Sequence, residues 1–150
     1  MELGFDPGDR ADAGLAFIGR IRSPWSPGDC PHNVAEARER DGWARLEVAP
    51  EYAPGLEGLA AGDAVLLLYW LGSRRRDIIR QSPRHDPGTR GVFALRSPVR
   101  PNPVGLSLVR IVSIDAAAGV VEIDATDAFD GTPLLDIKPW KPGADVLPNV

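Results

Sequence analysis

The amino-acid sequence predicts a mainly β protein, built as a small closed or nearly closed barrel of six to seven strands with long loops rich in proline and glycine. Three observations predict this class. The 150 residues include 16 glycines and 15 prolines, both more than average. The apolar segments have the length of strands, and strands do not alternate with helix-length segments. Closure would remove the exposed edges that an antiparallel sheet otherwise presents.

The N-terminal half divides into a leader and the first strands. Residues 1–14 are predicted to be a flexible leader, because glycine and proline alternate there with acidic residues. The barrel domain is expected to span residues 15–150. Its first strands are predicted at Leu15–Arg22 and at Trp43–Val48, where alternate residues are apolar. A connector with at most one helical turn is predicted for Glu51–Gly62.

The remaining strands follow from further apolar segments. Ala64–Leu71 is a continuous apolar run that is too short for a typical helix, which predicts a buried central strand. Three more strands are predicted at Gly91–Arg96, Val104–Ile114 and Val120–Ala125. Asp115–Gly119 would form the short link between the last two. With 43% hydrophobic residues, a chain of this length can bury one globular core without disulfides.

Composition also excludes several classes of protein. The single cysteine, Cys30, excludes an internal disulfide framework and favours a reducing, cytoplasmic compartment. His32 and His85 show no ligand spacing, so we expect no metal site. The glycine fingerprint of dinucleotide-binding folds, the phosphate-binding loop and the Gly-x-Ser-x-Gly motif of serine hydrolases are all absent from the sequence. With no export signal and no membrane-length apolar run, we expect a soluble protein without a membrane partner.

Positive charge is concentrated in one segment of the chain. From Arg74 to Arg110, nine arginines against two aspartates give a local charge of +7, although the whole chain carries −4 at pH 7. A dense group of arginines attracts phosphate and binds it through bidentate contacts. The alternative is a solvated loop with no binding role. The absence of lysine from this segment favours recognition of an anion, because the planar guanidinium matches phosphate better.

Three connecting segments differ in composition from ordinary loops. Arg22–Asn33 and Arg96–Ser107 each contain three prolines, and Asp127–Trp140 contains the tight turn Asp130-Gly131. Such stiff segments offer carboxylates for hydroxyl or amino groups and free main-chain groups for the edge of a base. The main hypothesis is that the three segments converge at the rim of one sheet and bind an adenosyl ligand there. The alternative for Arg22–Asn33 is a surface turn without a binding role, in which His32 forms its hydrogen bonds within the protein.

Three stretches of sequence resemble a known family. These are IGRIRSPW at residues 18–25, GVFALRSPVRPNPVGLS at residues 91–107 and DGTPLLDIKPW at residues 130–140. They are similar to the TsaA-like (TrmO) family, and the resemblance covers the chain from Phe17 to its end. It implies a small β-barrel that binds S-adenosylmethionine, a homodimer with the cofactor site close to the subunit boundary, and methylation of threonylcarbamoyladenosine in tRNA.

The resemblance also implies a set of site residues. Gly72 and Ser73 lie where the family usually carries a histidine, and Asp136 is expected to be structural or to contact the cofactor. No catalytic base is assigned, and His32 is expected to bind rather than to move a proton. We expect tRNA phosphates to contact Arg74, Arg75, Arg76 and Arg80. The full set of expected cofactor contacts is Pro31, His32, Asn33, Gly72, Ser73, Arg96, Leu106, Asp130, Gly131, Thr132 and Pro133.

Two other functions remain open at this point. One is a module that binds an adenosyl ligand or RNA without turnover, which the absence of the usual histidine at Gly72 favours. The other is a methyltransferase for a small molecule, in which the arginines would serve solubility or a subunit contact. The tRNA-acting members carry a further C-terminal domain, so recognition of the acceptor is expected to differ in this chain.

Overall fold

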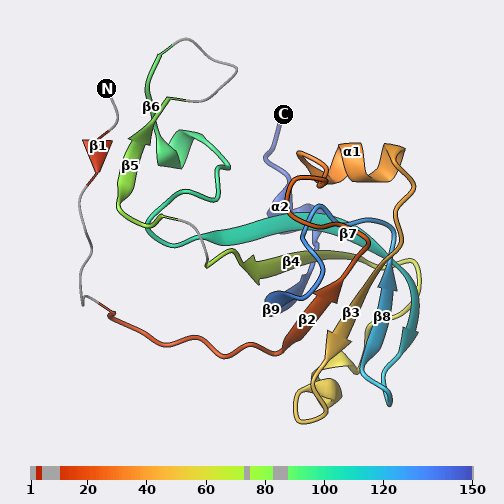
Figure 1. Cartoon of the computed structure of the whole chain (residues 1–150). Helices are drawn as coiled ribbons and strands as arrows, with labels where there is room; N and C mark the ends of the chain where they lie inside the picture. The colour runs from red at the N-terminus through yellow and green to blue at the C-terminus, as the bar shows by residue number, and fades with distance from the viewer. Residues whose placement is uncertain (1–2, 5–10, 73–74, 83–87, 150) are drawn as a thin grey trace. The chain divides into compact units, whose positions relative to one another are not determined.

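A computed structural model describes residues 3–4, 11–72, 75–82 and 88–149. The chain divides into two compact units. The first contains Met1–Leu15 and Trp70–Gly105, and the second contains Ala16–Tyr69 and Leu106–Val150. The second unit holds most of a closed ring of strands (Figure 1). The predicted division into a leader and a barrel domain at Leu15 remains a prediction.

Six strands form the ring in the order β2-β3-β8-β7-β4-β9, which confirms the mainly β, closed architecture that the sequence predicts. Strand β2 pairs on one side with β3 and on the other with β9, both antiparallel. The ring therefore has no open edge. Its strands are β2 (Gly19–Arg22), β3 (Ala44–Val48), β4 (Ala64–Trp70), β7 (Val104–Asp115), β8 (Val120–Ile123) and β9 (Thr132–Pro139).

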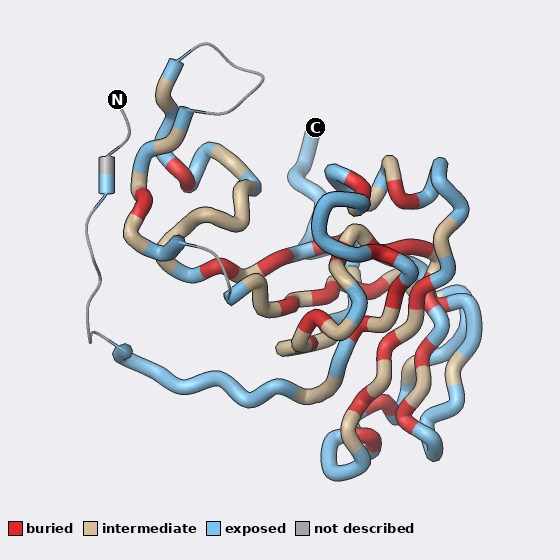
Figure 2. Tube along the Cα trace, in the orientation of Figure 1, coloured by how far each residue is buried: buried red, intermediate tan, exposed pale blue. Residues whose placement is uncertain are grey.

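Alternating burial along the strands places the core inside this ring. In β3 the apolar face that the sequence predicts, Ala44, Leu46 and Val48, is buried, whereas the residues between are only half-buried. Figure 2 shows this alternation as red and tan segments along the strands. The apolar run of β4 also alternates, so it is not buried equally on both faces. The largest fully buried side chains of the ring are Ile21, Leu46, Leu67, Ile111 and Leu134.

Two predicted strands differ from the structure. The first strand begins only at Gly19, four residues later than predicted. The segment predicted as a strand at Gly91–Arg96 is a 3₁₀ turn, η2 (Val92–Ala94), preceded by the two-residue strand β6 (Arg90–Gly91). This turn buries Val92 completely and leaves Phe93 84% exposed. A short apolar run can bury one side chain through a turn as well as through a strand, so its composition alone does not distinguish the two.

Strand β9 lies in a segment that the sequence analysis treats as a stiff connection with a tight turn, so it is not among the predicted strands. Pro133 is the second residue of the strand and Pro139 is its last. Both are therefore near the strand ends, where a missing N–H disturbs the ladder least. Between them, Leu134 and Asp136 to Lys138 pair with β4. The sequence DGTPLLDIKPW thus supplies the strand that closes the ring.

Short helices and small strands complete the two units. The second unit contains α1 (Val34–Glu39), the 3₁₀ helix η1 (Ala53–Leu56) inside the predicted connector, and α2 (Pro142–Asp145). In the first unit, β5 (Ile78–Gln81) pairs with β1 (Leu3–Gly4) and with β6. Within the described ranges, none of the helices has the length and apolar character needed to cross a membrane.

Candidate functional site

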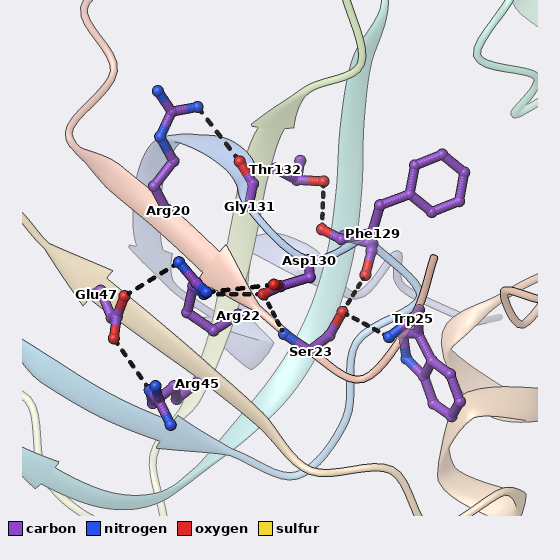
Figure 3. A network of polar contacts seen from close by, with 11 residues as sticks. Arg20, Arg22, Ser23, Trp25, Arg45, Glu47, Phe129, Asp130, Gly131 and Thr132 are labelled. Carbon is purple, nitrogen blue, oxygen red and sulfur yellow. Dashed lines mark hydrogen bonds and ion pairs between the residues drawn. The ribbon is translucent and has the colours of Figure 1, made fainter. Parts of the chain in front are cut away.

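Two of the three predicted loop segments lie against each other in the second unit. The Trp25 indole N–H donates to the Thr126 carbonyl at 2.6 Å, and the Ser23 hydroxyl donates to the Ala128 carbonyl at 2.7 Å. The Asp130 amide in turn donates to the Trp25 carbonyl at 3.0 Å. Figure 3 shows these side chains between β2 and the turn that leads into β9. The Arg22–Asn33 and Asp127–Trp140 segments therefore form one continuous surface.

The Asp130 carboxylate holds this surface together by pairing with β2. Its Oδ1 lies 2.8 Å from Arg22 Nε and accepts a hydrogen bond from the Ser23 amide at 3.2 Å, while Oδ2 accepts from Arg22 Nη2 at 3.2 Å (Figure 3). Arg22 also lies 3.8 Å from Glu47 on the neighbouring strand. The carboxylate expected to contact the cofactor thus has partners within the protein.

The turn at Asp130 depends on glycine. Gly131 has φ +84°, a left-handed backbone conformation that residues other than glycine rarely adopt. Its amide donates to the Ile21 carbonyl at 2.8 Å, and its carbonyl accepts from Arg20 Nη1 at 3.3 Å. The buried Thr132 hydroxyl donates to the Phe129 carbonyl at 2.7 Å. Asp130 and Gly131 therefore form a fixed turn that leads into Thr132 and Pro133, the first two residues of β9.

His32 and Asn33 belong to the start of a helix that the sequence analysis did not predict. Asn33 Oδ1 accepts from the Glu36 amide at 2.8 Å, and Glu36 Oε2 accepts from the His32 amide at 2.6 Å. This exchange is a variant of the capping box, and the Asn-x-x-Glu spacing was the signal that could have found it. Pro31 is buried, whereas the side chains of His32 and Asn33 are exposed.

Helix α1 is attached to the ring through arginines near its C-terminal end. Arg38 Nε donates to Asp124 Oδ2 at 2.7 Å, and Arg38 Nη2 donates to the Leu108 carbonyl at 2.8 Å. Arg40 pairs with Asp29 at 2.8 Å, and its guanidinium lies 4.5 Å from the Trp25 ring. These contacts fix the loop that carries His32 and Asn33.

A polar cluster that the sequence analysis missed lies beside both loops. Tyr69 donates its hydroxyl to Asp127 Oδ1 at 2.9 Å, and the Cys30 thiol donates to the Asp127 carbonyl at 2.7 Å. Burial and the nearby Asp127 raise the pKa of Tyr69 well above its ordinary value, while the Ser107 hydroxyl acts in the opposite direction. Burial, followed by Asp127, raises the pKa of Cys30 to about 11. Burial also raises the pKa of Asp127, against the opposing hydrogen bond from Tyr69.

The other predicted cofactor residues are distributed over both units. Leu106 lies on the outer face of β7 in the second unit and is 47% exposed. Gly72 and Arg96 lie in the first unit, and both are exposed. Ser73 lies outside the described residues. Roles for these residues in cofactor binding remain predictions.

Gly72 packs directly against an indole. A Cβ atom at this position would lie 1.9 Å from Trp70 Nε1, so any side chain here would require the indole to move. The Arg76 guanidinium lies 5.6 Å from the centroid of the Trp70 ring. The glycine that replaces the expected histidine therefore accommodates a tryptophan two residues earlier.

The arginines predicted to contact tRNA differ in their surroundings. Arg75 forms two hydrogen bonds to the Asp77 carboxylate, at 3.0 and 2.8 Å. Arg76 donates to the Pro101 carbonyl at 2.6 Å and to Asn102 Oδ1 at 3.2 Å, so it supports the proline-rich segment. Arg80 is exposed on β5, and Arg74 lies outside the described residues. In the described part of the chain, no three His, Cys, Asp or Glu side chains gather to hold a metal ion.

Comparison with known proteins identifies the family. The tRNA-methyltransferase O N-terminal domain matches residues 20–146. The chain belongs to this family. The match includes every strand of the ring except the first residue of β2, together with both proline-bearing loops of the second unit. The resemblance noted in the sequence to the TsaA-like (TrmO) family is thereby confirmed.

Relatives and solved structures agree with this family. VirR of Rhizobium radiobacter, named as a probable S-adenosyl-L-methionine-binding protein, is 42% identical over 132 residues, 87% of this chain and 73% of VirR. An S-adenosyl-L-methionine-binding protein of Archaeoglobus fulgidus is 35% identical over 134 residues, 89% of this chain and 93% of that protein. A crystal structure of TrmO superposes with a TM-score of 0.71 at 31% identity, and TrmO from Pseudomonas aeruginosa with 0.69 at 30%.

The chain corresponds to only part of the solved TrmO proteins. Both superpositions include 92% of this chain. They include 62% of the first TrmO chain and 60% of the Pseudomonas aeruginosa TrmO chain. It covers 36% of another probable S-adenosyl-L-methionine-binding protein from Archaeoglobus fulgidus. The activity and substrates of the longer proteins are therefore proposals for this chain.

Proposed function

We propose that this protein is an S-adenosylmethionine-dependent methyltransferase that modifies a threonylcarbamoyladenosine-type nucleotide in tRNA. The family match over residues 20–146 carries this proposal. The names of VirR and of the Archaeoglobus relative, both for binding of this cofactor, support the same ligand here. A homodimer in the cytoplasm is part of the same proposal.

The cofactor would be held where the two loops of the second unit meet. The Asp130 to Pro133 turn and the Pro31 to Asn33 loop are both fixed by hydrogen bonds, so their main-chain groups are oriented before a ligand arrives. Such orientation lowers the ordering cost of binding. The buried, polar Asp127 cluster beside these loops also fits a ligand that carries charge as well as an apolar base.

Methyl transfer depends more on how the protein positions the cofactor and the acceptor than on reactive side chains. The cofactor supplies a methyl group on a positively charged sulfur, and transfer is an in-line displacement by the acceptor atom. The protein must therefore hold donor and acceptor at attack distance and exclude water. An acceptor nitrogen that carries a proton also needs a base. His32 is exposed and its amide takes part in the helix cap, which supports a binding role rather than proton transfer.

Transfer of a labelled methyl group tests this function directly. The protein is incubated with methyl-labelled S-adenosylmethionine and bulk tRNA, and label is counted in RNA and in small molecules. Label in tRNA is the expected result. Binding of the cofactor without transfer to any acceptor would refute the methyltransferase. Because the relatives are named as binding proteins and Gly72 replaces the expected histidine, a binding module without turnover is the second candidate.

The arginines give the tRNA substrate a separate test. Replacing Arg74, Arg75 and Arg76 together with alanine is expected to weaken tRNA binding and to reduce its dependence on salt. The reason is that a protein with fewer phosphate contacts releases fewer counterions from the RNA when it binds. Lys141→Ala, an exposed cation on a different element, is the matched control. Unchanged tRNA affinity in the triple variant, measured by filter binding at two salt concentrations, would remove the role of this segment.

A further inference from the structure

Asp127 differs from the ion-paired carboxylates of the second unit, and also from Glu36, Asp63, Asp115 and Asp145, whose side chains accept hydrogen bonds from main-chain amides. Its side chain is half-buried, and its hydrogen-bond partner is the neutral Tyr69 hydroxyl. Among the residues that the structure describes, no cation lies within ion-pair distance of it. Five other carboxylates of the unit lie within 3.5 Å of an arginine or lysine nitrogen: Asp29, Glu47, Asp124, Asp130 and Asp136.

A partly buried carboxylate without a cation is costly, because its charge has lost water without gaining a partner. Burial indeed raises the pKa of Asp127. The adjacent Cys30 and Tyr69 do not neutralise this charge, because a thiol and a phenol are either neutral or negative, and their raised pKa values keep both neutral near pH 7. The other charged groups that act on Cys30 are Arg40, Asp29 and Glu36. Asp127 is therefore the only charge within its cluster with Tyr69, Cys30 and Ser107, and it is negative.

The cluster lies next to the predicted cofactor segments of the second unit. Cys30 directly precedes Pro31, Ser107 directly follows Leu106, and Asp127 is three residues before Asp130. The Tyr69 hydroxyl on β4 donates to this carboxylate, and the Cys30 thiol in the first loop donates to the Asp127 main-chain carbonyl. Ser107 on β7 lies beside the Tyr69 hydroxyl. A ligand held by these segments would thus bring its charge close to Asp127.

We infer that Asp127 is the specificity-determining carboxylate that recognises the positive sulfonium of S-adenosylmethionine, so that this ligand binds more tightly than the uncharged thioether product, S-adenosylhomocysteine. This inference rests on the proposed function. The two ligands share the base, the ribose, the amino group and the carboxylate, and they differ in the methyl group and the charge on sulfur. A single negative charge near the sulfur therefore favours the substrate form of the cofactor over its product.

Calorimetric dissociation constants for both ligands test the inference. Asp127→Asn keeps the acceptor for the Tyr69 hydroxyl and removes the charge. It is expected to raise the Kd for S-adenosylmethionine about tenfold and to leave that for S-adenosylhomocysteine within about twofold. Asp130→Asn is the matched control, because it weakens an internal ion pair and should change both constants by the same factor. An equal change for both ligands in Asp127→Asn would overturn the inference.

A pH series on the unaltered protein provides the same test without a substitution that could impair folding. As the pH falls toward the raised pKa of Asp127, the carboxylate gains a proton and the preference for S-adenosylmethionine should decline. Cys30 and Tyr69 stay neutral over this range, and Ser107 does not titrate. His32→Gln is measured in parallel to remove the exposed imidazole. A ratio of the two affinities that stays constant down to the lowest pH at which the protein remains folded would refute the inference. A protein that binds neither ligand would instead refute the proposed function itself.

Discussion

The clearest structural prediction concerns the turn before β9. Asp130→Ala removes an ion pair with Arg22 at 2.8 Å and the acceptor for the Ser23 amide at 3.2 Å. The ion pair is about 40% exposed on both sides, at 39% and 42%, so its loss should cost about 0.5 to 1 kcal/mol. The partly buried Ser23 amide then lacks its partner, which costs about 1 kcal/mol more. We expect the free energy of unfolding to fall by about 2 kcal/mol in total.

Urea denaturation followed by tryptophan fluorescence measures this loss. Asp29→Ala is the control, since the Asp29 side chain is more exposed, at 75%, and among the described contacts it accepts only from Arg40, at 2.8 Å. That substitution should change stability by less than about 0.5 kcal/mol. In an Arg22→Ala background, Asp130→Ala should cost less than it does alone. The reasoning fails if Asp130→Ala destabilises the protein no more than Asp29→Ala does.

Three further predictions follow from single positions. Gly72→His should lower the melting temperature and alter tryptophan fluorescence, because its Cβ would meet the Trp70 indole at 1.9 Å; Gly143→His, at an open position, should not. Asn33→Ala should lower the free energy of unfolding, measured by urea denaturation, by about 1 kcal/mol because the helix loses its N-cap. Asn33→Ser should lower it much less, because serine can also cap the helix. The Cys30 thiol should react with a disulfide reagent at pH 8 far more slowly in the folded than in the unfolded protein, because burial raises its pKa to about 11; equal rates in the two states would contradict the burial of this thiol.

The sequence alone predicted the strands in which apolar and polar residues alternate and the apolar ones are buried. Ala44, Leu46 and Val48 could be assigned to the core because every second residue of β3 is apolar. This reasoning did not extend to β9, which contains Pro133 and Pro139 and depends on partner strands on both sides. Helix α1 was within reach of sequence analysis through the spacing of Asn33 and Glu36.

The candidate site shows the same limit more strongly. The tight turn at Asp130-Gly131 could be predicted from its two residue types, because few other residue pairs allow the left-handed backbone conformation that Gly131 adopts. The partnership of Tyr69 with Asp127 could not, since 58 residues separate them and nothing local distinguishes Asp127 from its neighbours. Sequence analysis instead singled out Asp136, whose side chain lies 3.5 Å from Lys138. That the Asp127 carboxylate lies half-buried against a neutral hydroxyl becomes visible only after the strands are paired.

Closure of the ring by β9 also determines when the protein can complete its fold during synthesis. Gly19 pairs with Leu134, so the first and last strands of the ring are separated by more than a hundred residues of chain. Until Thr132–Pro139 has left the ribosome, β2 and β4 each present an unpaired edge to the cell. A chain without Thr132–Pro139 would thus leave both of these edges open, so closure of the whole ring depends on its last strand.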